Sequence, residues 1–189
     1  MLYLKRLLAS SQTVFTLDDL KKIWQIKNPS YLRVLVNRLN KRGEIERLQR
    51  GIYAIDENFN ELELANRLKA PSYVSLETVL QKENIVFQNY GQAIFSISNN
   101  TVSKNVAGRE FKYFKIADEI LSNPLGIEIK DGAYIASAER AVCDRAYLTP
   151  NYYFDNLRPL NLAALKQISK IYNKRAQKEI KQLIGKTCV

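Results

Sequence analysis

One segment near the N-terminus constrains the fold more than any other, because it predicts a helix with a defined start, a defined end and one apolar stripe. Asn28 followed by Pro29 is a typical helix start, since asparagine caps free N–H groups and proline needs no N–H partner at the first helical position. Leucine and valine then recur at positions 32, 35, 36 and 39, the spacing of a helix that buries one face. Gly43 marks its end.

Two shorter helices are predicted before this segment and a hairpin after it. Residues 3–10 form a short amphipathic helix, and Thr16 caps a second helix with Asp18 and Asp19 in its first turn. Residues 44–55 alternate polar and apolar side chains on both sides of Arg50 and Gly51, which predicts a β-hairpin with a basic tip. Three helices followed by such a hairpin are typical of a winged helix-turn-helix.

The outward side chains of the third helix and the hairpin are candidate DNA contacts. In helix-turn-helix proteins the N-terminal part of the second motif helix meets base edges, and flanking residues meet phosphates. The candidates for base recognition are Ser30, Tyr31, Arg33, Val34 and Asn37. The candidates for phosphate contact are Arg38, Lys41 and Arg42 on the helix and Arg47 and Arg50 on the wing. A solvated helix face, or a winged helix that binds protein, stays open as the alternative.

Charge supports a polyanionic partner. The chain has a net charge of +10 and a pI near 9.6, and the charge is uneven: +5 over residues 1–57, −2 over 58–157 and +7 over 158–189. Nucleic acid is the usual polyanion for such a protein, here double-stranded DNA. The sequence contains no histidine, which excludes histidine-dependent hydrolysis. No residue is assigned a catalytic role.

Location and cofactors follow from what the sequence lacks. No apolar stretch is long enough for a membrane span and the N-terminus has no signal-peptide pattern, so we expect a cytoplasmic protein with no membrane partner. Cys143 and Cys188 give neither a disulfide framework nor a metal-binding spacing, and both are expected to be reduced. We expect no cofactor and no metal.

The composition changes near residue 60, which predicts a domain at residues 1–57 and another at 58–189. A helix over residues 60–69 ends before Pro71, and Ser75 caps the next helix. Residues 92–98 and 110–116 predict strands, and residues 126–137 predict a hairpin turning at Asp131 and Gly132. Ser137 caps a further helix, and the tail is helical from about Asn161. The fold class is α+β: a winged helix-turn-helix, then a mixed domain with a small sheet and a helical, basic C-terminus.

Three groups in the second half have competing interpretations. Ser137, Glu139, Arg140 and Asp144 resemble a carboxylate site of a metal-dependent nuclease, but a helix start followed by a weak i, i+4 surface pair explains them better. The aromatic residues are either sheet core or the lining of a ligand pocket; they are Phe95, Phe111, Tyr113 and Phe114. The tail cations form either a second basic helix face or a plain soluble surface; they are Lys166, Lys170, Lys174, Arg175, Lys178 and Lys181.

Three segments in this order resemble the AbiEi-like antitoxins of type IV toxin-antitoxin (abortive infection) systems. They are the wing RLQRGIYAI, the stretch PSYVSLETVL and the helix start in GAYIASAERAVCDRAYL. The resemblance implies an N-terminal domain that represses its own operon at inverted repeats, with Arg33, Arg38, Arg47 and Arg50 as DNA contacts. It also implies a C-terminal domain that neutralises a cognate nucleotidyltransferase-like toxin. A ligand-sensing regulator without a toxin, or a protein-interaction module, is the alternative.

Overall fold

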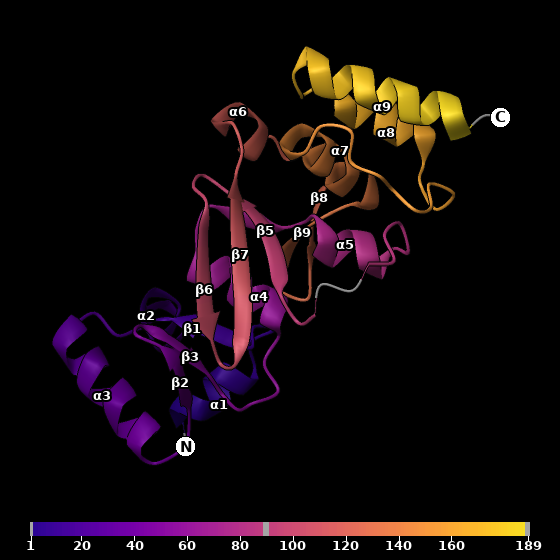
Figure 1. Ribbon diagram of the computed structural model, residues 1–189. Helices are drawn as coiled ribbons and strands as arrows, with labels where there is room; N and C mark the ends of the chain where they lie inside the picture. The colour runs from indigo at the N-terminus through magenta and orange to yellow at the C-terminus, as the bar shows by residue number, and fades with distance from the viewer. Residues whose placement is uncertain (1, 89–90, 188–189) are drawn as a thin grey trace.

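The computed structural model describes residues 2–88 and 91–187, and it contains two hydrophobic cores (Figure 1). Cys188 lies outside the described residues. The first core belongs to residues 2–55, called here the N-terminal unit, and the second core belongs mainly to residues 61–187, called the second unit. The sequence predictions of a mixed helix and strand protein are confirmed at this level.

Three helices and a three-stranded sheet form the N-terminal unit. The elements are α1 (Leu2–Leu8), β1 (Val14–Thr16), α2 (Leu17–Trp24), α3 (Pro29–Lys41), β2 (Glu46–Gln49) and β3 (Ile52–Ala54). The sheet order is β1-β3-β2, and both pairings are antiparallel. The predicted helices and hairpin are confirmed, whereas β1 was not predicted. That strand has only three residues, too few for an alternating pattern to mark it in the sequence.

The second unit is built on a six-stranded sheet. Its elements are α4 (Glu61–Leu68), β4 (Ser72–Val74), α5 (Glu77–Lys82), β5 (Ile94–Ser98), β6 (Val102–Val106), β7 (Arg109–Lys115), α6 (Asp118–Leu121), β8 (Ile127–Lys130), β9 (Ala133–Ala136), α7 (Ala138–Leu148), α8 (Leu162–Ser169) and α9 (Lys174–Thr187). The order β6-β7-β5-β4-β9-β8 includes two parallel pairs, β5 with β7 and β4 with β9. The sheet is larger than the sequence analysis indicated, because β4 and β6 were not predicted.

Helices cover both faces of this sheet. The Tyr113 hydroxyl on β7 donates to the Ala65 carbonyl on α4, 2.7 Å away. The next residue, Phe114, lies under the Arg145 guanidinium of α7. Because successive strand residues point to opposite faces, α4 and α7 lie on opposite sides of the sheet. Phe95 and Phe114 stack with ring centroids 6.2 Å apart, so these aromatic residues contribute to the packing of the sheet, as do the buried Phe111 and Tyr113.

The predicted cap of α5 is wrong. Leu76, with a φ of 55°, precedes the helix and makes no side-chain cap hydrogen bond. The Ser75 hydroxyl instead donates to Asp144, 2.7 Å away. The serine was assigned from its place before a helical pattern, but burial beside a carboxylate gives its hydroxyl a stronger partner. The caps at Thr16, Asn28 and Ser137 are confirmed.

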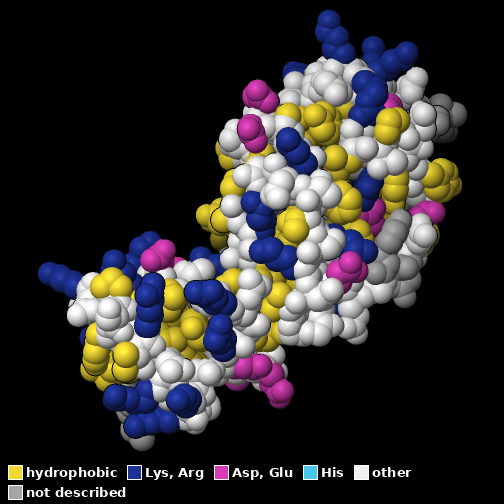
Figure 2. Space-filling view, turned by 60° about the vertical axis from the view of Figure 1, so that its left-hand side comes forward, with side chains coloured by type: hydrophobic (Ala, Val, Ile, Leu, Met, Phe, Trp, Pro, Cys, Tyr) yellow, Lys and Arg dark blue, Asp and Glu magenta, His cyan; other side chains and the backbone are white. Residues whose placement is uncertain are grey.

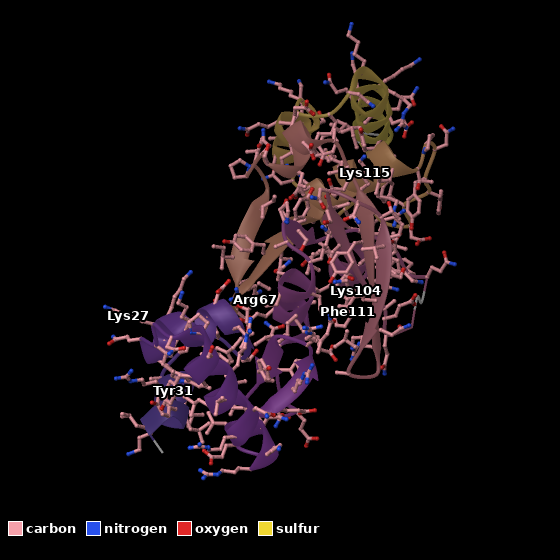
Figure 3. The ribbon with its side chains drawn as sticks, turned by 90° about the vertical axis from the view of Figure 1, so that its left-hand side faces the viewer. Lys27, Tyr31, Arg67, Lys104, Phe111 and Lys115 are labelled. Carbon is pink, nitrogen blue, oxygen red and sulfur yellow. The ribbon has the colours of Figure 1, made fainter. Side chains whose placement is uncertain are left out.

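Glu63 joins the two units. Its side chain is buried, and its Oε2 accepts hydrogen bonds from the Thr13 amide at 2.8 Å, the Thr13 hydroxyl at 2.9 Å and the Val14 amide at 3.2 Å. Arg67, one turn later on α4, lies 3.6 Å from Glu63 and 3.4 Å from Asp19 on α2. Figure 3 shows Arg67 where the N-terminal unit meets the second unit. This set of contacts is called the Glu63 junction below.

Candidate nucleic-acid interface

The caps of α2 and α3 fix how these two helices meet. Thr16 and Asp19 form a reciprocal capping box at the start of α2, and Gln25 ends that helix in the left-handed conformation with a φ of 57°. The Asn28 side chain accepts hydrogen bonds from the amides of Ser30 and Tyr31 and so starts α3. A short turn, residues 25–28, therefore connects α2 to α3, and caps fix both the end of α2 and the start of α3.

The apolar stripe of α3 is buried as predicted, and this orients the rest of the helix outward. Leu32, Leu35, Val36 and Leu39 are 1–6% exposed. The candidate DNA contacts on this helix are all exposed; they are Ser30, Tyr31, Arg33, Val34, Asn37, Arg38 and Lys41. Arg42, just after the helix, is exposed as well. The structure thus brings these candidates together on one surface of the N-terminal unit.

The β2–β3 hairpin carries the other two candidates. Arg47 on β2 and Arg50 at the turn are exposed. Gly51 has a φ of 82°, a conformation that glycine adopts without a steric cost and that closes the turn beside Arg50. Figure 2 shows Lys and Arg side chains gathered on the N-terminal unit, at the lower left, with hydrophobic side chains among them.

Most of these cations have no acidic partner among the residues that the structure describes. Arg33, Arg38, Lys41, Arg47 and Arg50 form no ion pair there. Arg42 lies 3.7 Å from Glu44, and both side chains are partly or fully exposed. A cluster of unpaired cations repels itself, and a polyanion relieves that repulsion.

Helix α1 packs against the end of α2 and reaches the start of α3. The Trp24 Nε1 donates to the Tyr3 carbonyl at 3.0 Å, and Arg6 donates to the Trp24 carbonyl at 3.2 Å. The hydroxyls of Tyr3 and Tyr31 lie 3.3 Å apart, so α1 also contacts the start of α3. Tyr31 is labelled in Figure 3 on the outer side of the N-terminal unit.

Sequence analysis missed three cations on the same unit. Lys21 and Lys22 on α2 and Lys27 before α3 are exposed. In a helix-turn-helix the first motif helix crosses the phosphate backbone, so these positions are suited to phosphate contact. The signal in the sequence is the presence of three lysines within residues 21–27, whereas the caps and length of α2 indicate only that it is a helix.

The tail cations do not lie on one continuous helix, as their spacing had indicated. Helix α8 ends at Ser169, and α9 starts at Lys174 after a turn. Lys166 therefore lies on α8, Lys170 at its C-cap, and the remaining candidates Lys174, Arg175, Lys178 and Lys181 on α9. Spacing by four residues cannot detect a break between helices. Arg175 is partly occupied, since it pairs with Glu179 at 2.8 Å and donates to the carbonyls of Ala146 and Tyr147.

The surface pair predicted on α7 is also wrong, because Arg140 and Asp144 are completely buried. Asp144 accepts hydrogen bonds from the hydroxyls of Tyr73 at 3.0 Å, Tyr172 at 2.7 Å and Ser75 at 2.7 Å. Arg140 lies 3.5 Å from Asp144 and donates to three backbone carbonyls, those of Ile120, Asn123 and Leu125. We call this group the Asp144 network.

The electrostatics of the Asp144 network follow from its burial. Burial raises the pKa of Asp144, against the opposing effects of the Arg140 charge and the three hydroxyl donors. Burial also raises the pKa of Tyr73 and of Tyr172, and the Asp144 charge adds to both shifts. Glu139 does not join the network, because its carboxylate accepts the Asn161 amide at 2.9 Å. The four nuclease-like candidates therefore do not converge on an open site.

The comparisons with known proteins concern the N-terminal unit. No helix within the described residues is long and apolar enough to span a membrane. No curated protein matches the chain. Residues 3–55, which hold all the elements of the N-terminal unit, match the model of a family described as "Transcriptional regulator, AbiEi antitoxin", so the resemblance predicted from sequence is confirmed over this part of the chain.

Proposed function

We propose that the N-terminal unit is a winged helix-turn-helix that binds double-stranded DNA, with α3 in the major groove and the β2–β3 hairpin against the backbone. The order of three helices and a hairpin supports this topology. The observation that carries the proposal is the set of exposed cations on α3 and the hairpin that have no acidic partner among the described residues. The match of residues 3–55 to a regulator family supports the same function.

Individual roles follow from position on α3. The residues of the first three turns that face outward are assigned to base edges; they are Ser30, Tyr31, Arg33, Val34 and Asn37. Arg38, Lys41 and Arg42 lie further along and are assigned to phosphates, as are Arg47 and Arg50 on the hairpin. The missed cations Lys21, Lys22 and Lys27 are added to the phosphate set.

At the level of the operon, the protein acts as a repressor of its own promoter and as an antitoxin. Binding of α3 and the wing at inverted repeats blocks polymerase, and the C-terminal domain predicted over residues 58–189 neutralises a cognate nucleotidyltransferase-like toxin. The description of the matched family as a regulator and antitoxin supports both roles. No residue is given a catalytic part.

The first experiment measures binding of the purified chain to its own upstream region and to a random duplex by fluorescence anisotropy, at two salt concentrations. Phosphate contacts release counterions, so affinity for both duplexes falls as salt rises. Preference for the upstream duplex at the higher salt concentration supports an operon repressor. No binding to either duplex contradicts the proposal and leaves a protein-binding winged helix.

A pair of variants tests the assigned roles. Arg33→Ala removes a base contact, so we expect it to reduce the preference for the upstream duplex by about 1–3 kcal/mol. Arg50→Ala removes a phosphate contact, so we expect it to weaken binding to both duplexes alike and to lower the salt slope by about 1. The same measurement checks both. Equal losses on both duplexes for both variants contradict the assignment.

The antitoxin role has a separate test. The reading frame next to this gene is expressed with and without the present chain, and growth is followed. Recovery of growth that persists when Arg33, Arg38 and Arg50 are all replaced by alanine places the neutralising surface outside the DNA face. A neighbouring protein without toxicity contradicts the antitoxin role and leaves the repressor.

One observation favours the ligand-sensing alternative. A cleft of about 810 Å³ lies beside the Glu63 junction, within the size range of small-molecule sites. Its lining includes Arg67, Tyr73, Ile129 and Tyr134. The aromatic residues first considered for such a pocket, including Phe95 and Tyr113, lie in the sheet core instead. A change of operator affinity with added cell metabolites, lost in Tyr134→Ala, distinguishes this alternative.

A further inference from the structure

An apolar side chain occupies the centre of the face that α3 turns to solvent. At about 100° per residue, positions 30, 34, 37 and 41 lie directly opposite the buried stripe at 32, 35, 36 and 39. Val34 is one of these four, and its side chain is 56% exposed. A valine at this place contributes nothing to the core, and its branched side chain lowers helix propensity slightly.

Its surroundings are polar and basic. Arg33 flanks Val34 on one side of the helix, and Arg38 and Tyr31 flank it on the other. Neither arginine has an acidic partner among the described residues, so both charges surround the valine without being neutralised. Such surroundings disfavour an apolar protein partner, because docking one would desolvate two unpaired cations. They favour a binding partner that carries negative charge where it meets the two arginines and presents one apolar group to Val34.

Tyr31 extends this apolar point by one turn. It is three residues before Val34, and side chains three apart are neighbours on a helix surface. The Tyr31 side chain is 50% exposed, and its hydroxyl contacts that of Tyr3. This contact ties the ring to α1, and the helix spacing places Tyr31 beside Val34 on the exposed surface.

One chemical group in the major groove fits this description. Each base pair shows hydrogen-bond donors and acceptors on its edge there, and thymine alone among the four bases adds an apolar group, the C5 methyl. Phosphates lie on both sides of the groove at the positions that flanking cations reach. A small branched side chain such as valine buries that methyl without leaving a polar group unpaired.

We propose that Val34 recognises a thymine methyl group, with the Tyr31 ring beside it, and that thymine at this position contributes to the choice of operator. The inference rests on the proposed function, since it requires α3 in the major groove. It assigns base discrimination to an apolar contact in addition to the hydrogen bonds of Arg33 and Asn37.

The test replaces thymine by deoxyuridine, which lacks only the methyl group. A preferred site is first selected from a randomised duplex library with the full chain, and each thymine of that site is then replaced singly. We expect replacement at one position of each recognised half-site to weaken binding about fourfold, the equivalent of one buried methyl group. Replacement elsewhere should leave affinity unchanged. Anisotropy titrations measure both.

The valine variant links the effect to this side chain. Val34→Ala should bind the thymine duplex about as weakly as the wild type binds the deoxyuridine duplex, and it should not distinguish the two. Leu8→Ala is the matched control, because Leu8 is also an exposed apolar helix residue, 63% exposed, on α1. That variant should keep the fourfold difference. Unchanged thermal unfolding of both variants shows that each is folded.

The outcomes separate this inference from the proposed function. Selection of a site whose affinity is insensitive to every deoxyuridine overturns the inference and leaves DNA binding intact. A deoxyuridine effect that persists equally in Val34→Ala also overturns it, since another side chain then meets the methyl group. Failure to select any duplex at all contradicts the proposed function itself.

Discussion

The two units use arginine in opposite ways. In the N-terminal unit the arginines of α3 and the hairpin are exposed, and most lack acidic partners among the described residues. In the second unit Arg140 is completely buried and Arg145 is 8% exposed, and each contacts a carboxylate, Asp144 and Glu77 respectively. The same residue type therefore lies exposed without an acidic partner among the described residues in one unit and contributes to packing in the other.

This contrast explains why net charge alone is a poor guide to function. A buried arginine contributes to the count of positive charge, but its guanidinium is fully used by internal partners. Arg140, for example, also lies over the rings of Tyr73 and Tyr172, with its central carbon 5.2 Å and 5.5 Å from their centroids. Only charges that are exposed and lack an internal partner attract a nucleic acid.

The largest expected effect comes from breaking the Asp144 network. Asp144→Ala leaves the Arg140 charge buried without its carboxylate, so we expect the free energy of unfolding to fall by about 3–5 kcal/mol. Chemical denaturation monitored by circular dichroism measures the loss. The matched surface control, Arg38→Ala, should change stability by about 0.5 kcal/mol or less. Similar losses for both variants would contradict the contrast between the units.

A smaller effect is expected at the boundary between them. Glu63→Ala removes the acceptor of three hydrogen bonds, so the amide of Val14 loses its buried partner. We expect unfolding to become easier by about 1–3 kcal/mol. Hydrogen exchange at the amides of Thr13 and Val14 should increase more than that within α7. Equal protection in variant and wild type would show that the junction contributes little.

Alkaline pH sharpens the contrast further. Burial raises the pKa of Tyr73, Tyr113 and Tyr172, all in the second unit. The unfolded chain releases these protons near pH 10, whereas the folded chain keeps them, so the folded state binds more protons above that pH and stability falls as pH rises. Each tyrosine contributes about 1.4 kcal/mol per pH unit in that range.

Stability at pH 9 and pH 11, measured by denaturation with absorbance at 295 nm to follow tyrosinate, checks this slope. Tyr113→Phe should reduce the slope by one tyrosine's share, although it also loses the hydrogen bond to Ala65. Tyr153→Phe is the matched control substitution in the same unit, because its side chain is 78% exposed. A slope that is the same in Tyr113→Phe and in the wild type would show that this tyrosine ionises equally in both states.

The N-terminal unit could be predicted from sequence because its signals are local. The caps at Thr16 and Asn28 and the stripe of α3 are each set by residues within one or two turns. The Asp144 network could not, because Asp144 meets Tyr73, Ser75 and Tyr172 through contacts 28–71 residues apart in the chain. The sequence pattern shows Arg140 and Asp144 as neighbours on a helix but not which face of that helix is buried.

The predicted strands at 92–98 and 110–116 and the hairpin at 126–137 are confirmed by β5, β7, β8 and β9, but β4 was not predicted, again because its contacts are long-range. β4 has three residues and forms pairs with β5 and β9, so the partners that define it lie far along the chain. The candidate site residues on α3, in contrast, could be predicted from the periodicity of a single helix, which shows which of its faces is buried. Their grouping on one surface followed from the buried stripe, whereas the break between α8 and α9 had no marker in the spacing of lysines.

The Glu63 junction has a consequence for the entropy of association. Only residues 55–60 separate β3 from α4, and hydrogen bonds join Thr13 of the N-terminal unit to Asn60 and Glu63, at the end of that segment. Folding has therefore already restricted the rotation of α3 relative to the second unit, at the opposite end of which lies α9 (Figure 1). A DNA duplex or a protein that binds at either end of the molecule therefore meets two units whose relative orientation is already fixed. Less conformational entropy of the chain remains to be lost on binding.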